Sequence, residues 1–337
     1  MHMINKLSIA TTLLDQMPKQ GVSHPVPIIA SDGNVYFLKN FKIDNGDIYD
    51  AMFFQEALAT QLAQTINLPV PDWAIITIDN QTLTDFPELR FEYQFVPGQY
   101  YASRKIRGNV IDLVNVVNEA AQLKIRGSVQ KLHNIFSKIK NKQDIPKIIL
   151  FDFWTLNIDR FTNSGNLILR SDNDGNYLLS IDFGHCFNGP KWDKNTQNFF
   201  NQLIQAIKDQ HELQFCADLT KGYLDLSQRH GQLRWKLGII FNELERQIQF
   251  SDSINPFSKS EFDIRSISDS KLTLILNSIP ASWITDGSTQ KEAYFSFLKN
   301  QRAILPNLIQ YLADQKIFTN YNGGTLTWHQ EKNISTQ

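Results

Sequence analysis

The first third of the chain alternates short apolar runs with turn-forming clusters, a pattern typical of β-strands. Residues 26–30 and 35–41 are two such runs around Ser31-Asp32-Gly33-Asn34, which predicts a β-hairpin. In the second strand, positions 35, 37, 39 and 41 share one face, because successive side chains of a strand point to opposite sides. Lys39 is therefore expected to point the same way as three apolar neighbours.

One helical pattern interrupts these strands. Residues 51–66 carry apolar side chains at helical spacing, and the prolines at positions 69 and 71 would end that helix. Two further strands are predicted after it, over residues 75–78 and 92–96, the second ending before Pro97-Gly98.

From about residue 111 onward the apolar spacing is mostly helical. It predicts one or two helices over 111–142 and another, started by Pro146, that runs to residue 154. Residues 167–169 and 177–181 break this pattern and flank a polar turn, which indicates a second hairpin. The remaining spacing predicts helices around 199–207, 213–226, 233–248, 268–276 and 290–312.

This change of pattern predicts an α+β fold of two lobes. The β-rich N-lobe would comprise residues 1–98 and the predominantly helical C-lobe residues 99–337, with the boundary near Pro97-Gly98. A chain of 337 residues, 42% of them hydrophobic, is long enough to give each lobe a core of its own.

Charge and composition narrow the choice of partners. The formal net charge of -1 gives no overall attraction to nucleic acid or to an anionic membrane. Residues 101–150 contain ten Lys and Arg residues against three Asp and Glu residues. We interpret this basic region as a solvated helical face, with nucleic-acid binding as the alternative.

The apolar stretches and the cysteines indicate where in the cell the protein is expected and which sites its cysteines cannot form. No stretch approaches the ~20 continuous apolar residues of a membrane span, and the N-terminal apolar run lacks the features of a cleaved leader. A cytoplasmic location without a membrane partner is therefore the expectation. Cys186 and Cys216 lack the spacing of a zinc site or a disulfide framework and are expected to be buried.

The residues with the clearest chemistry lie on either side of the second hairpin. Residues 157–166 read Asn-Ile-Asp-Arg-Phe-Thr-Asn-Ser-Gly-Asn, and residues 181–184 read Ile-Asp-Phe-Gly. Phosphoryl transfer needs a carboxylate to orient the attacking hydroxyl, and oxygen ligands for the magnesium that neutralises a triphosphate. Asp159 is the candidate for the first role, and Arg160 is placed to pair with a carboxylate or a phosphate.

Three residues are candidates for binding the metal. Asp182 follows an apolar strand and lies two positions before Gly184, and Asn163 and Asn166 follow Asp159 by four and seven positions. Position 164, where the commonest kinase pattern has asparagine, is a serine here, so either asparagine could be the ligand. The spacing favours Asn166, because it directly precedes the strand predicted over residues 167–169.

Two segments nearer the N-terminus could bind the phosphates of a nucleotide. Lys39 lies on the apolar face of the predicted strand 35–41, and the next helix carries Glu56, an arrangement in which the lysine contacts the phosphates and the glutamate holds the lysine. Gly21 and Ser23 lie in a loop before the first hairpin that could cover the triphosphate. With a single glycine in that loop, its contacts would come from the Ser23 hydroxyl and the backbone amides.

The order of these motifs resembles that of the HipA-like kinases. The matching segments are the loop 21–26 leading to Tyr36-Phe37-Leu38-Lys39, residues 56–63 with Leu68-Pro69-Val70-Pro71, residues 93–98, residues 157–160 with Asn163 and Asn166, residues 181–185, and more loosely residues 279–283. The similarity extends over about residues 20–300 and is most specific in the two central motifs.

The resemblance implies a bilobal protein-kinase-like fold that binds ATP and Mg²⁺ between its lobes. In that family the residues matching Lys39, Glu56, Asp159 and Asp182 bind phosphate, hold the lysine, orient the hydroxyl and bind the metal. Residues 93–98 would connect the lobes, and the adenine would lie against them near Phe95 and Val96.

The resemblance also implies an acceptor. HipA-like toxins phosphorylate protein serines, notably on aminoacyl-tRNA synthetases, so the implied partners are such a synthetase or another translation component, and an antitoxin. Some members autophosphorylate a serine in the phosphate loop, and Ser23 matches that serine by location. Two alternatives stay open: a lipid or small-molecule kinase of related fold, and a non-catalytic pseudokinase that binds a nucleotide or a partner.

Overall fold

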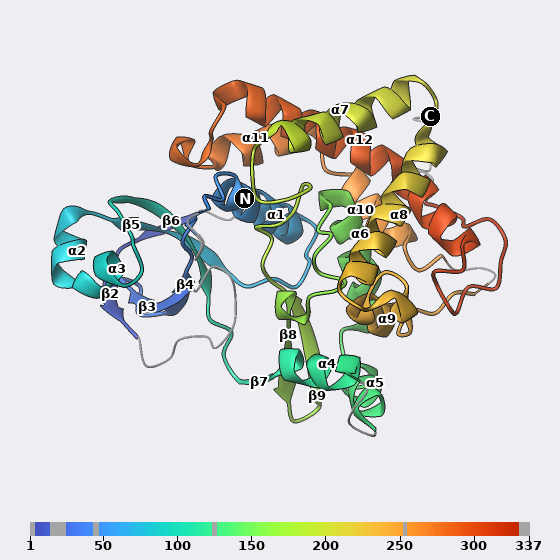
Figure 1. The fold of residues 1–337 in the computed structure, drawn as a ribbon, viewed down its shortest axis with the longest axis horizontal. Coiled ribbons are helices and arrows are strands. Elements are labelled where there is room, and N and C mark those ends of the chain that lie inside the picture. The colour runs from blue at the N-terminus through green and yellow to red at the C-terminus, as the bar shows by residue number, and fades with distance from the viewer. Residues whose placement is uncertain (1–3, 14–24, 43–46, 123–126, 252–254, 330–337) are drawn as a thin grey trace, which may run out of the picture.

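The first third of the chain forms a six-stranded sheet in the order β1-β5-β6-β4-β3-β2, in which only β1 and β5 are parallel. The computed structural model describes residues 4–13, 25–42, 47–122, 127–251 and 255–329. Figure 1 shows this sheet on the left and the C-terminal helices on the right. The strands are β1 Asn5–Leu7, β2 Ile9–Thr12, β3 Val26–Ala30, β4 Val35–Leu38, β5 Trp73–Ile78 and β6 Gly98–Arg104.

The predicted hairpin and helix of this part are confirmed. Strands β3 and β4 pair around a turn at residues 31–34, and the helix α1, Met52–Thr65, follows. Every residue of α1 from Met52 to Ala63 is buried. A helix enclosed on all sides is fixed by packing against several elements at once, so polar side chains on α1 must find partners inside the protein.

The strand predicted over residues 92–96 does not form. After β5 the chain makes two short helices, α2 Asn80–Asp85 and α3 Pro87–Phe91, and the next strand is β6. Gln94 has a φ of +55°, a left-handed conformation that interrupts an extended strand. The polar and apolar residues of this segment alternate, but only Phe95 is buried, so the pattern reflects a loop with one anchoring side chain.

The connection between the two halves of the chain also lies elsewhere than expected. Strand β6 pairs with β5 and β4, so residues 93–98 lead into the N-terminal sheet and do not connect two lobes. The chain leaves this sheet after Arg104 and enters a second sheet at β7, Asn109–Ile111. The division into residues 1–98 and 99–337 stays a prediction, but the N-terminal sheet continues to Arg104.

The second sheet has three antiparallel strands in the order β7-β8-β9. Strands β8, Leu167–Asp172, and β9, Gly175–Ser180, form the predicted second hairpin. The expected helices around this sheet are present as α4 Leu113–Gln122, α5 Ser128–Ser137 and α6 Ile145–Thr155, the last with Pro146 in its first turn.

The rest of the chain is helical, as predicted. Its helices are α7 Lys194–Lys208, α8 Glu212–Arg229, α9 Ile239–Glu245, α10 Ser258–Arg265, α11 Asp269–Ser278 and α12 Gly287–Asp314. The helix expected over 233–248 is divided, because Lys236 and Gly238 have φ values of +56° and +139° that end one helical turn before α9 begins. Helix α10 was not predicted. Helix α12 packs against α6, α7 and α8 and runs along the top of the molecule in Figure 1.

Along the described ranges, none of the helices combines the length and the apolar character that crossing a membrane requires. Cys186 and Cys216 are both buried and unpaired, as expected.

Candidate active site

Three charged residues from distant parts of the sequence meet where the two halves of the chain face each other. Lys39 follows β4, Glu56 lies in α1, and Asp182 follows β9. The Lys39 ammonium forms an ion pair with Glu56 and a second one with Asp182, at 2.9 Å from Asp182 Oδ1. The Lys39 backbone N–H donates to the Tyr101 carbonyl of β6, so the lysine is held at the end of its strand.

Burial and charge set the protonation of this cluster. Burial by itself would lower the pKa of Lys39, but the Asp182 and Glu56 carboxylates raise it above its ordinary value, so the ammonium stays charged. Burial would likewise raise the pKa of Asp182, but the Lys39 charge holds it well below its usual range. Burial raises the pKa of Glu56 to about 7 against the opposing effect of Lys39.

Glu56 also fixes the segment after Asp182. Its carboxylate accepts the backbone N–H groups of Phe183 at 3.2 Å and of Gly184 at 3.0 Å. A Cβ at position 184 would lie 2.6 Å from Met52 Cγ and 3.2 Å from Glu56 Oε1. Any larger residue at position 184 would therefore have to displace the Met52 and Glu56 side chains of α1, and the glycine is explained by this close packing and not by a special backbone angle.

Asp159 and both candidate asparagines form a second cluster. Asn163 and Asn166 donate their side-chain N–H groups to Asp159 Oδ2, at 3.1 and 2.9 Å. Asp159 is half-buried, and its Oδ1 accepts no hydrogen bond from the described residues. The amides therefore fix the orientation of the carboxylate and leave one oxygen free to accept a proton from another group.

The two asparagines differ in what their amide oxygens do. Asn163 is exposed, and its Oδ1 accepts the Gly165 N–H at 2.9 Å, so this side chain caps the short 3-10 helix Ser164–Asn166. Asn166 is buried, and its Oδ1 has no hydrogen-bond partner in the described part of the chain. Of the alternatives that the sequence left open, the geometry favours Asn166 as the metal ligand.

Arg160 is buried and pairs with a carboxylate, one of the two partners expected for it. Its Nε lies 2.8 Å from Asp152 Oδ2, and its guanidinium donates to the Ile181 carbonyl at 3.0 Å and to the Asn166 carbonyl. The same group lies 5.0 Å from the Phe183 ring centroid. Arg160 therefore ties the Asp159 segment to the Asp182 segment, and its side chain is a positioning group inside the protein.

Several supporting residues could not be found from the sequence. Asp152 in α6 is the carboxylate partner of Arg160. Gly238 lies so close to the Asp159 segment that a Cβ there would be 2.1 Å from the Phe161 carbonyl oxygen, and Gln232 donates to the Thr162 carbonyl at 3.0 Å. An isolated Asp, Gln or Gly carries no local motif, so only the fold identifies these contacts.

Some predicted site residues are not part of this cluster. Gly21 and Ser23 lie outside the described residues. Phe95 is buried against Tyr100, with ring centroids 4.9 Å apart, and the backbone of Val96 is hydrogen-bonded to the Tyr100 hydroxyl. Both residues belong to the loop that enters β6, and none of their described contacts reaches Lys39, Asp159 or Asp182.

The donors of the cluster fit magnesium. Magnesium in nucleotide sites commonly uses one or two carboxylates together with substrate phosphates and water. Asp182 has a side chain 38% exposed and offers Oδ2, since Lys39 contacts Oδ1, and Asn166 offers its amide oxygen. Among the residues that the structure describes, no three His, Cys, Asp or Glu side chains gather into an all-protein metal site.

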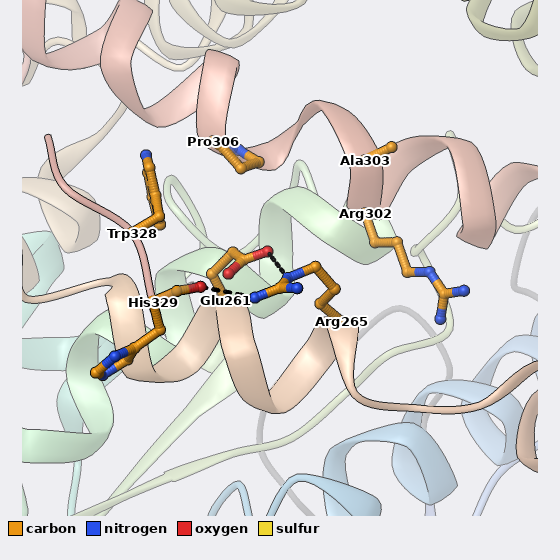
Figure 2. Close-up of a pocket in the computed structure, with 7 residues that line it drawn as sticks. All are labelled: Glu261, Arg265, Arg302, Ala303, Pro306, Trp328 and His329. Carbon is orange, nitrogen blue, oxygen red and sulfur yellow. Dashed lines mark hydrogen bonds and ion pairs between the residues drawn. The ribbon is translucent and has the colours of Figure 1, made fainter. Parts of the chain in front are cut away.

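A separate surface pocket of about 430 Å³ lies in the helical half, between α10, α12 and residues 328–329 (Figure 2). In this pocket the Arg265 guanidinium donates hydrogen bonds to the Glu261 carboxylate and to the His329 carbonyl, both at 2.9 Å. The pocket shares no residue with the cluster around Lys39.

The basic region of residues 101–150 is partly neutralised. Arg104 pairs with Asp72 at 3.0 Å, Lys131 with Glu119 at 3.1 Å, and Lys147 with Asp263 at 3.6 Å. Lys124 and Arg126 lie outside the described residues. The Lys147 side chain is only 11% exposed, so it is not part of a solvated face, and for the rest of the region the interpretation as a solvated face stays a prediction.

Comparisons with known proteins agree with this geometry. The model of the HipA-like kinase family matches residues 12–222, which is more than half of the chain. Among curated proteins no sequence matches the chain. Among solved structures, the chain is similar to the crystal structure of a Helicobacter pylori proinflammatory kinase, CtkA, with 11% sequence identity and a TM-score of 0.51. The likeness covers 89% of this chain and 94% of that one, and it shows a shared kinase-like fold.

Proposed function

Because the chain belongs to the HipA-like kinase family, as its match over residues 12–222 shows, we propose that it transfers the γ-phosphate of Mg-ATP to a hydroxyl group. One observation carries this proposal. The Lys39, Glu56 and Asp182 cluster and the Asp159 cluster are joined by the buried Arg160, so the groups that phosphoryl transfer needs are already held in one arrangement.

Lys39 would bind the α- and β-phosphates. Its ammonium is charged and is held by a buried carboxylate, so a phosphate oxygen would meet a cation that is already positioned. With the nucleotide in place, Lys39 would exchange its contact with Asp182 for phosphate oxygens and keep its contact with Glu56. The Lys39 to Asp182 ion pair would thus satisfy both charges when the nucleotide is absent.

Asp159 would orient the acceptor. As the acceptor oxygen bonds to the γ-phosphorus, its proton passes to Asp159 Oδ1, and the bond from the γ-phosphorus to the oxygen that bridges to the β-phosphate breaks, releasing ADP. Asn163 and Asn166 hold the other carboxylate oxygen, so Oδ1 faces the acceptor without a competing hydrogen bond from the described residues.

Asp182 and Asn166 would hold the magnesium. When bound, the ion neutralises the charge that builds up on the phosphate oxygens during transfer. Asn163 would act through Asp159 and through the cap of the 3-10 helix.

The adenine would lie against residues 105–108, where the chain crosses between the sheets. Strands β4 and β6 are antiparallel, with Phe37 opposite Ser103, so the end of β6 lies beside the residues that lead to Lys39. This replaces the expected location near Phe95 and Val96.

For the acceptor we propose a protein serine or threonine, on an aminoacyl-tRNA synthetase or another translation component, with an antitoxin as a further partner. This rests on the family alone. A lipid or metabolite hydroxyl would use the same Lys39, Asp159 and Asp182 chemistry. The experiment must therefore distinguish transfer to a protein from transfer to such a molecule.

The test is transfer of label from ATP labelled in the γ-phosphate, with magnesium, to cell-lysate proteins and to the protein itself. Asp159→Ala is the matched control, because Asp159 is half-buried and its removal should leave the fold intact. Label on a discrete protein that disappears with Asp159→Ala would support the proposal. Full transfer by the variant would refute the role of Asp159. Magnesium-dependent ATP binding without labelled protein would favour a lipid or metabolite acceptor, and no ATP binding would favour a pseudokinase.

A further inference from the structure

The segment that follows Asp182 has no hydroxyl side chain whose phosphorylation could activate the protein. Between Phe183 and Asn195 there is no Ser, Thr or Tyr. The first hydroxyl is that of Thr196, which is 2% exposed and donates to the Lys191 carbonyl at 3.0 Å. Many kinases order this segment through a phosphate that pairs with arginine. In this chain another device must hold it.

The start of α1 holds the segment directly. The Gln55 side chain donates to the Gly189 carbonyl at 2.8 Å, and the Ala51 backbone N–H donates to the Pro190 carbonyl at 3.1 Å. Asp50 Oδ1 accepts the Trp192 backbone N–H at 2.9 Å. Gln55 precedes Glu56, so the contacts that hold the segment also fix the turn of α1 that presents Glu56 to Lys39.

The helical half of the protein anchors these contacts from the other side. Gln55 Nε2 also lies 2.9 Å from the hydroxyl of Tyr294 in α12, and both residues are fully buried. The Tyr294 ring packs on Phe54 of α1 at 4.8 Å and on Phe187 of the segment at 5.0 Å. One aromatic residue of α12 therefore touches both α1 and the segment after Asp182.

The backbone of the segment is strained and held in place. Phe187, Asn188 and Gly189 have φ values of +58°, +72° and +121°, which is unfavourable for a bulky residue such as phenylalanine. The Phe187 N–H donates to the Thr155 carbonyl of α6 at 2.7 Å, and its ring is enclosed. Such a conformation persists only where its surroundings determine it strongly.

We propose that Gln55 and Asp50 are positioning residues that lock α1 and the segment 184–192 together, so that the Lys39 to Glu56 pair forms without covalent modification of this segment. The chain would be competent for transfer as synthesised. The inference rests on the proposed function and concerns how that activity is regulated: any control of phosphoryl transfer would have to act outside the segment 184–192.

Hydrogen–deuterium exchange of the full chain, treated with phosphatase and free of nucleotide, tests the lock without relying on activity. We expect the amides of Ala51, Phe187 and Trp192 to be protected, and Gln55→Met to make them exchange at least tenfold faster. Gln61→Met is the matched control, because Gln61 is the same residue type in the same helix but contacts Ser278 of α11. It should leave these three amides unchanged.

Kinetics of the same proteins give the second readout. The reaction is transfer of label from ATP labelled in the γ-phosphate. We expect the phosphatase-treated protein to transfer label at its full initial rate without a lag. Gln55→Met should lower the kcat of this transfer at least tenfold and change the KM for ATP less than threefold. Should Gln55→Met fail to fold, Asp50→Ala takes its place, because Asp50 is half-buried and its loss removes the Trp192 contact.

The outcomes separate the two proposals. Protected amides that Gln55→Met releases, in a protein that transfers no phosphate, would support the lock and refute the proposed function. Transfer that needs prior phosphorylation, or amides that exchange freely in the unmodified protein, would overturn the lock while leaving the kinase function standing.

Discussion

Arg160 offers the sharpest test of how the site is held together, because its guanidinium is fully buried and joins both halves of the candidate site. We consider Arg160→Met, which keeps an unbranched side chain of similar length and removes every donor. The variant loses the ion pair with Asp152, the hydrogen bond to the Ile181 carbonyl and the contact with the Phe183 ring. The Asn166 carbonyl keeps one donor, the Ile181 N–H at 3.1 Å.

The structure sets the size of the effect. Burial raises the pKa of Asp152 to about 6 against the opposing charge of Arg160. At pH 7, roughly one pH unit above this pKa, the Asp152 carboxylate is favoured over the neutral acid by about 1 kcal/mol. Without Arg160 the side chain would take up a proton, so losing the charge pair costs about that amount. The unpaired Ile181 carbonyl costs about 1–3 kcal/mol and the lost ring contact about 1 kcal/mol. The sum is about 4 kcal/mol, within the range for breaking a buried ion pair.

Urea unfolding at pH 7 measures this loss, and a second variant apportions it. Asp152→Asn combined with Arg160→Met removes the orphaned carboxylate. Relative to Arg160→Met alone, the double variant should therefore regain only about 1 kcal/mol of stability, and it should not regain phosphoryl transfer. Recovery of most of the stability by the double variant would refute the reasoning, because it would show that the charge and not the carbonyl dominates.

Three further predictions concern the neighbouring residues. Asn166→Ala should weaken magnesium-dependent ATP binding by about tenfold in calorimetry, whereas Asn163→Ala should leave the dependence on magnesium unchanged; equal losses would contradict the assignment of the ligand. Gly184→Ala should lower stability by about 1–3 kcal/mol and reduce kcat, because its Cβ would displace the Met52 and Glu56 side chains, and a variant with wild-type melting temperature and rate would disprove that this packing matters. The pKa of Glu56, raised by burial to about 7, predicts that kcat falls as the pH drops through about 7, since protonation removes the carboxylate that holds Lys39. Glu56→Gln should have a lower kcat and lack this dependence, and a variant that kept it would exclude Glu56 as its origin.

The sequence alone determined the parts of this protein that depend on local pattern. The hairpins β3-β4 and β8-β9 and the helices α1 and α6 follow from side-chain periodicity and turn residues, which act over a few positions. Lys39, Glu56, Asp159 and Asp182 were recognisable because their order and their neighbours form motifs, and the structure brings Lys39, Glu56 and Asp182 into contact.

The tertiary structure decided what depends on contacts between distant segments. Residues 92–96 alternate like a strand, yet β6 begins at Gly98, because a strand forms only where a neighbouring edge can pair with it. The sequence offered two asparagines and favoured Asn166 only by its position before a strand, whereas in the structure the Asn163 side chain is used to cap Ser164–Asn166. Asp152, Gln55 and Tyr294 carry no local signal at all: each matters through buried contacts with other segments, and only the folded protein determines which groups meet.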